Sequence, residues 1–177
     1  MATAARTVTD VCREAKRASR TLARLDTDAR NGALEAIAAA LEERTAEVLE
    51  ANARDMEAGR EAGLSAALLD RLALDERRVA AMADGVRQIA ALDDPVGEVV
   101  EGRRLANGLD LRKVRVPLGV VAVVYEARPN VTIDAAALAL KSGNAIVLRG
   151  SSSAARGSTS CTWAVLRPST LRSSSEE

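Results

Sequence analysis

The stretch V-P-L-G-V-V-A-V-V-Y-E-A-R-P-N-V-T, residues 116 to 132, decides the fold. Within it, Val120 to Val124 has the length and the β-branched composition of a buried parallel strand. A polar loop, Tyr125 to Asn130, follows this strand and leads into an Ala-rich segment. Because ligands of open α/β sheets bind beyond the carboxyl ends of the strands, we expect functional residues in this loop.

The residues that follow extend this stretch into a β-α-β unit. Val131 to Leu140 is predicted to form a helix that ends at Lys141 to Asn144, and Ala145 to Leu148 is predicted to form a second buried strand. The unit is about thirty residues long, which suits a crossover between parallel strands. The sequence therefore predicts an α/β fold in which helices and a hairpin lead into an incomplete Rossmann-type parallel sheet.

Upstream of this unit, residues 3–92 follow helical spacing. Polar residues suited to helix starts precede the apolar repeats, and glycines are predicted to end the third helix. The predicted starts are Asp26, Thr45, Ser65 and Asp75, and the predicted end is at Gly59 and Gly63.

A hairpin is predicted between the helices and the β-α-β unit. Val96 to Val100 and the alternating residues Leu109 to Val116 flank a glycine-containing turn. The alternation changes face between Leu111 and Val114, which predicts a bulge near Arg112-Lys113. The expected organisation is a helical region 1–94, a hairpin arm 95–117, the start of an α/β domain 118–156 and a Ser/Arg-rich tail 157–177.

Composition excludes several classes of function. The chain carries 25 basic and 25 acidic residues and has 1% aromatic residues, so we expect no nucleic-acid partner. No apolar stretch is long enough to span a membrane and no signal core is visible, so we expect a cytoplasmic protein. With no histidine, and with Cys12 and Cys161 far apart in sequence, we expect no metal site and no disulfide framework.

Five segments in register resemble the gamma-glutamyl phosphate reductases, a family within the aldehyde dehydrogenase superfamily. Each segment is modest alone, but together they cover about residues 1–156, and the Y-E-A-R-P-N-V-T segment is specific to this family. The segments are Leu64–Leu74, Asp94–Gly97, Val114–Gly119, Tyr125–Thr132 and Leu140–Asn144.

The resemblance implies a reaction. Family members use NADPH to reduce gamma-glutamyl phosphate to glutamate 5-semialdehyde with release of phosphate, in proline biosynthesis. A cysteine thiolate displaces phosphate to form a thioester, and hydride from the nicotinamide then reduces the thioester. The resemblance also implies a homo-oligomer joined through the hairpin arm.

Asn130 and Arg128 are the candidate residues of the loop. Asn130 matches the superfamily asparagine whose amide donates to the reacting carbonyl oxygen. From its spacing alone, Asn130 would instead cap the following helix, and the two roles are compatible. The guanidinium of Arg128 suits a carboxylate or an acyl phosphate, or else a surface salt bridge. Tyr125 and Glu126 belong to the motif, and we expect them to shape the loop.

Arg149, Gly150, Ser151 and Ser152 are the candidate cofactor-binding residues. They match the place where the superfamily contacts the adenosine ribose, and an arginine beside serines suits the 2′-phosphate of NADP. A glycine followed by serines at a strand end is also an ordinary loop.

The sequence departs from the family pattern near its end. The resemblance places the family nucleophile beyond residue 177, and Cys161 lacks the sequence context of that nucleophile. We expect the resemblance to end near Arg156, the remainder to result from a frameshift or a premature stop, and this truncated chain to be inactive. The alternative hypothesis is a non-catalytic helical module for dimerisation or interaction.

Overall fold

A computed structural model describes residues 7–126 and 128–150 of the chain. Within this part, five helices precede an antiparallel pair of strands and a β-α-β unit with two parallel strands, so the α/β class predicted from the sequence is confirmed. In chain order the elements are α1 (Val8–Leu22), α2 (Thr27–Glu43), α3 (Thr45–Glu61), α4 (Ala66–Leu72), α5 (Glu76–Ala91), β1 (Val99–Arg104), β2 (Asp110–Val114), β3 (Val120–Val124), α6 (Pro129–Lys141) and β4 (Ala145–Arg149).

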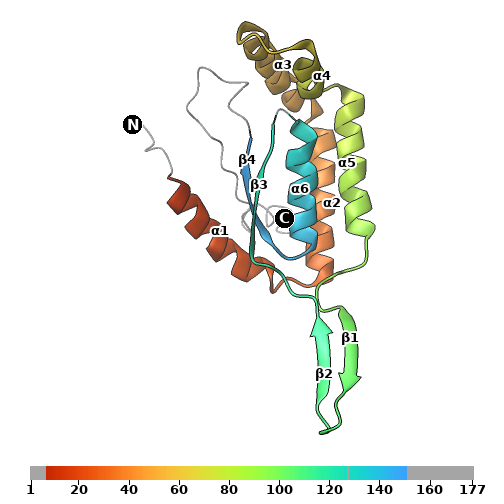
Figure 1. Ribbon diagram of the computed structural model, residues 1–177. Helices are drawn as coiled ribbons and strands as arrows, with labels where there is room; N and C mark the ends of the chain where they lie inside the picture. The colour runs from red at the N-terminus through yellow and green to blue at the C-terminus, as the bar shows by residue number, and fades with distance from the viewer. Residues whose placement is uncertain (1–6, 127, 151–177) are drawn as a thin grey trace.

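The parallel strands β3 and β4 form the middle layer of the body (Figure 1). Helix α1 lies against one face of the strands, and α6 covers the other with α2 and α5 packed behind it. The core between these layers consists of small and branched aliphatic side chains, among them Val11, Leu22, Leu34, Val86 and Leu140. Close packing of alanines and leucines thus builds a core without phenylalanine.

Side-chain caps start several helices where the sequence predicts them. Asp26, Ser65 and Asp75 each accept a hydrogen bond from the backbone N–H three residues further on. Each bond satisfies one of the free donors of a first helical turn. Thr45 begins α3 as predicted, but its hydroxyl donates back to the carbonyl of Leu41 instead of capping the new helix.

The prediction that Gly59 ends α3 is wrong. The helix continues to Glu61, and Gly63 forms the following turn with φ 73°. Gly59 is buried within the helix, where a Cβ would lie 3.0 Å from the side chain of Leu64 and 3.1 Å from that of Leu69. This glycine therefore serves the close approach of α4 to α3.

The strands β1 and β2 form an antiparallel hairpin that projects away from the layered body (Figure 1). Every residue of both strands is exposed. The first strand begins at Val99 and runs through Gly102, whereas the sequence pattern predicts it at Val96 to Val100 with Gly102 in the turn. Glycine in a strand interior weakens the sequence signal for a strand, which explains the shift.

The bulge of the hairpin lies on the strand opposite to the predicted one. Val99 and Glu101 pair with consecutive residues of β2, so Val100 is the additional residue on β1. The predicted place along the ladder is right, because Val99 and Glu101 pair with Val114 and Lys113, but the extra residue lies on the strand opposite residues 112–113. A change of face in the alternation locates a bulge along the ladder but does not tell which strand carries the extra residue.

The two parallel strands differ in burial. Residues Ala145 to Leu148 of β4 are buried as predicted, but β3 is only half-buried and Val124 is 70% exposed. In the described part of the chain β3 pairs with β4 alone. The expectation of a fully buried first strand is wrong, because composition does not reveal how many neighbours cover a strand.

A network of buried polar groups fixes the C-terminal end of α6. The guanidinium of Arg30 donates to the carboxylate of Asp94 and to the carbonyl of Lys141. The ammonium of Lys141 donates to the side chain of Asn31 and to the carbonyl of Ala90, each over 2.7 Å. The network joins α2, the end of α5 and the C-terminal end of α6.

Candidate functional site

The loop after β3 and the end of β4 meet at one edge of the parallel pair. Val124 lies opposite Arg149 in the ladder, and the backbone N–H of Tyr125 donates to the carbonyl of Arg149 over 3.1 Å. Both strands therefore present their carboxyl ends to the same side. This is the edge where open α/β sheets place ligands.

Tyr125 connects the strand edge with the following helix. Its hydroxyl shares a hydrogen bond of 2.5 Å with the hydroxyl of Thr132, and its ring packs against Ile146 and Leu148. A Cβ at Gly150 would lie 3.7 Å from the Tyr125 hydroxyl oxygen. These contacts connect the loop after β3 with α6 and with β4.

The first turn of α6 carries both loop candidates. Arg128 is the N-cap residue, makes no side-chain capping bond, and is followed by Pro129 at the first helical position. Asn130 lies inside this turn and is exposed. The alternative that Asn130 caps the helix is therefore wrong, and its amide is free to face the adjoining cavity.

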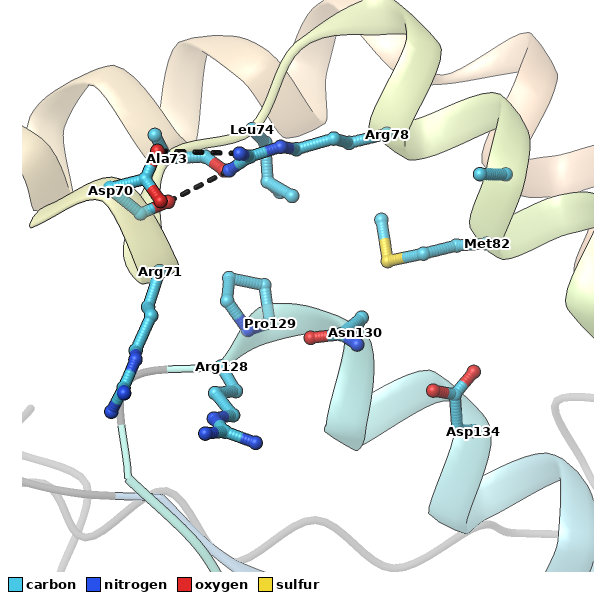
Figure 2. Close-up of a pocket in the computed structure, with 11 residues that line it drawn as sticks. Asp70, Arg71, Ala73, Leu74, Arg78, Met82, Arg128, Pro129, Asn130 and Asp134 are labelled. Atoms are coloured by element: carbon cyan, nitrogen blue, oxygen red, sulfur yellow. Dashed lines mark hydrogen bonds and ion pairs between the residues drawn. The ribbon is translucent and has the colours of Figure 1, made fainter. Parts of the chain in front are cut away.

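A cavity of about 480 Å³ lies between the first turn of α6 and the segment that joins α4 to α5 (Figure 2). Arg128 and Asn130 lie on one wall, and the residues of α4 and α5 form the other. The lining residues are Asp70, Arg71, Ala73, Leu74, Arg78, Ala81, Met82, Arg128, Pro129, Asn130 and Asp134. A hollow of this size accommodates a small polar metabolite.

The charged groups of the cavity differ in how they are satisfied. Arg78 pairs with the carboxylate of Asp70, whereas Arg71 and Arg128 have no ion pair or side-chain hydrogen bond with any described residue. Burial raises the pKa of Asp134, so the ionised form of this carboxyl is disfavoured. The cavity therefore offers two guanidinium groups that have no ion pair among the described residues, and one carboxyl whose pKa is raised by burial.

The cofactor candidates lie at the same strand edge but outside this cavity. Arg149 is exposed at the end of β4 and makes no ion pair with a described residue, so its guanidinium is available to an anionic group. Gly150 leaves ordinary contact space under Tyr125. The exposed guanidinium suits a phosphate group, whereas the space at Gly150 shows no close approach that requires a glycine. Ser151 and Ser152 lie outside the described residues.

Other sequence candidates add little to the site. Cys12 is exposed on α1, and Cys161 and the region 157–177 lie outside the described residues. In the described residues no three acidic or cysteine side chains are grouped to hold a metal ion. None of the described helices combines the length and the hydropathy needed to cross a bilayer.

Sequence reasoning missed Arg71, Arg78 and Asp134 as cavity residues. The signal was present, because Arg71 belongs to the segment Leu64–Leu74 that carries part of the family resemblance. Its distance in sequence from Asn130 concealed that the two residues share a cavity. Only the packing of α4 beside the start of α6 brings them together.

Comparisons with known proteins give one consistent picture. The model of the aldehyde dehydrogenase family matches residues 1–166. Gamma-glutamyl phosphate reductase of Thermobifida fusca (strain YX) is 57% identical over 149 residues, and that of Moorella thermoacetica is 54% identical over 162 residues. These matches cover 84% and 92% of this chain, which spans 36% and 39% of the two relatives' lengths.

Solved structures agree with the sequence matches. The gamma-glutamyl phosphate reductase of Thermotoga maritima superposes with a TM-score of 0.78 at 42% identity, covering 82% of this chain and 35% of that one. The reductase of Saccharomyces cerevisiae gives a TM-score of 0.79 at 34% identity. This match covers 85% of this chain and 38% of the yeast chain. This chain is therefore similar to both reductases in sequence as well as in fold.

Proposed function

The chain belongs to the aldehyde dehydrogenase family and has its fold, and on this premise we propose that it serves the NADPH-dependent reduction of gamma-glutamyl phosphate to glutamate 5-semialdehyde and phosphate in proline biosynthesis. The observation that carries the proposal is the exposure of Asn130 and Arg128 in one cavity at the start of α6, the helix that follows β3. The names of the relatives support the substrate. Because the chain spans little more than a third of those relatives, the proposal concerns the cofactor and oxyanion elements of the reaction.

Asn130 would stabilise negative charge on the reacting oxygen. Attack by a thiolate and addition of hydride both build charge on the same carbonyl oxygen, and a neutral amide donates to it without a counterion of its own. Asn130 belongs to the first turn of α6, and the far end of this helix is fixed by the Lys141 network. Such a preorganised donor contributes about 3–4 kcal/mol to the transition state.

Family membership implies a nicotinamide cofactor, and we assign its adenosine end to Arg149 and Gly150, with Ser151 and Ser152 beside them. When bound, this cofactor supplies the hydride. Arg149 would pair with the 2′-phosphate through its guanidinium fork, which favours NADPH over NADH. The organisation that accompanies this proposal is a helical region 1–94, a hairpin arm 95–117 and the start of the cofactor-binding domain 118–156.

A second function, subunit contact, is favoured by the hairpin. Apolar side chains on β1 and β2 are exposed, among them Val99, Val100, Leu111 and Val114. A two-stranded ribbon with exposed apolar residues is stabilised by packing against another surface. We propose a second copy of the chain as that surface, so that the arm joins a homo-oligomer.

Thermal unfolding with added nucleotide tests the cofactor assignment. NADPH at about 100 times its dissociation constant should stabilise the chain by about 2.7 kcal/mol, seen as a rise in Tm. Arg149→Gln should reduce the NADPH effect to the level of NADH, and Arg60→Gln on α3 should leave it unchanged. Equal Tm values with and without either nucleotide would contradict the proposal.

A further inference from the structure

Arg71 lies on α4, in a segment to which the proposed function assigns no role. It lines the same cavity as Arg128, from the opposite wall. In Figure 2 the two side chains extend toward the same side, away from the pair formed by Asp70 and Arg78. The cavity therefore has two guanidinium groups that come from α4 and from the start of α6.

Arg78 explains why Arg71 lacks a counterion. It donates to the carbonyls of Asp70 and Ala73 over 2.8 and 2.6 Å, and its guanidinium lies 3.4 Å from the carboxylate of Asp70. The acid next to Arg71 in sequence is thereby engaged, and the end of α4 is held against α5. Arg71 is left without an ion pair among the described residues.

Asp134 does not replace this missing counterion. It lies beyond Asn130 in the view of Figure 2, away from the two guanidinium groups. Its carboxyl is the only acid on the cavity wall, in the described part of the chain, that is not paired with Arg78. The two guanidinium groups, which have no ion pair among the described residues, repel each other, and a bound dianion removes that repulsion.

We propose that Arg71 and Arg128 together bind the phosphoryl group of the substrate, and afterwards the phosphate that is released. The inference rests on the proposed function, which supplies the acyl phosphate. A phosphoryl group carries two negative charges and three equivalent oxygens, so two planar forks can each make paired hydrogen bonds with it. Asn130 lies beside Arg128 in the same turn of α6, which suits an acyl oxygen next to the phosphoryl group.

Calorimetric titration of inorganic phosphate into the 177-residue chain tests the inference. The unchanged chain should bind phosphate and should not bind acetate measurably, since a single negative charge leaves one cation uncompensated. Arg71→Gln and Arg128→Gln should each weaken phosphate binding by about tenfold or more. Arg71→Lys keeps the positive charge but loses the guanidinium fork, so its phosphate affinity should lie between those of the unchanged chain and Arg71→Gln. Arg60→Gln should bind phosphate as the unchanged chain does.

Phosphate binding by Arg71→Gln equal to that of the unchanged chain would overturn the inference, and so would the absence of phosphate binding in every protein. Acetate binding as tight as phosphate binding would also overturn it. Thermal unfolding of the same preparations with and without NADPH separates the phosphate-binding proposal from the proposed function. If NADPH still raises the Tm while Arg71→Gln binds phosphate as tightly as the unchanged chain, Arg71 has no role in phosphate binding and the proposed function still stands.

Discussion

Asn52 holds one wall of the cavity through a single buried amide. Its Nδ2 donates to the carbonyl of Leu72, and its Oδ1 accepts from the backbone N–H of Leu74, over 2.9 and 2.8 Å. Asn52→Ala leaves both backbone groups without a partner and should lower the free energy of unfolding by about 1–3 kcal/mol. Urea denaturation measures this, with the exposed hairpin residue Asn107→Ala as a control that should change it little. A loss no larger than that of Asn107→Ala would contradict this role.

Asp94 makes stability depend on pH. Burial opposes ionisation of this carboxyl, but hydrogen bonds from Thr27 and Val96 and the charges of Arg30 and Lys141 outweigh it, so the net pKa is lowered. A lowered folded pKa stabilises the native state above the unfolded value of about 3.9, and this contribution is lost as pH falls through the folded value.

Asp94→Asn should therefore cost about 3 kcal/mol at neutral pH, because it leaves the buried Arg30 without its counterion. The difference in unfolding free energy from the unchanged chain should shrink as the pH is lowered below about 4. Denaturation at several pH values measures it, with exposed Asp93→Asn as the control. A difference that stays constant down to about pH 2 would refute the assignment.

The loop residues of the site could be predicted from sequence, whereas the opposite wall could not. Arg128 and Asn130 follow directly after a strand, and the rule for strand ends points to them. Arg71 carries no such local signal, because its place depends on how α4 packs beside α6. The capping alternative for Asn130 could not be decided from sequence either, since cap and first-turn positions lie two residues apart.

The close packing of α4 against α3 at Gly59 can be tested by comparison with Gly32, a glycine in α2 that has open space around it. A Cβ at Gly32 in α2 would meet nothing within 4 Å, so Gly32→Ala should stabilise the chain by about 0.5–1 kcal/mol through helix propensity. At Gly59 the added methyl meets Leu64 and Leu69 at 3.0 and 3.1 Å, which should cancel that gain or reverse it. Thermal unfolding of both variants measures the contrast, and an equal gain at the two sites would argue against close packing at Gly59.

Helices were predictable because their signals are local. The caps Asp26, Ser65 and Asp75 and the apolar repeats after them fix the starts of α2, α4 and α5. The hairpin was predicted in outline only, since pairing across strands decides where Val100 bulges and whether Gly102 is in a strand. Burial of β3 was overestimated, because it depends on neighbouring layers and not on the strand itself.

At the scale of the whole molecule, the hairpin predicts self-association. The chain should elute with at least twice its monomer mass in size-exclusion chromatography with light scattering. Leu111→Ser, which removes an exposed apolar residue from the hairpin, should shift the distribution toward the monomer. Leu92→Ser replaces an exposed leucine outside the arm and should leave the mass unchanged. A monomer in the unchanged chain would exclude the arm as a self-association surface.

Binding of NADPH at the carboxyl edge of β3 and β4, beside Asn130, is the central proposal for this chain. Titration of NADPH into the 15N-labelled chain, followed by NMR, tests it most directly. The backbone signals of Arg149 and Gly150 and the side-chain amide signal of Asn130 should shift, and the side-chain amide signal of Asn107 should stay unaffected. Shifts confined to α1 or the hairpin, or no shift at saturating NADPH, would contradict it.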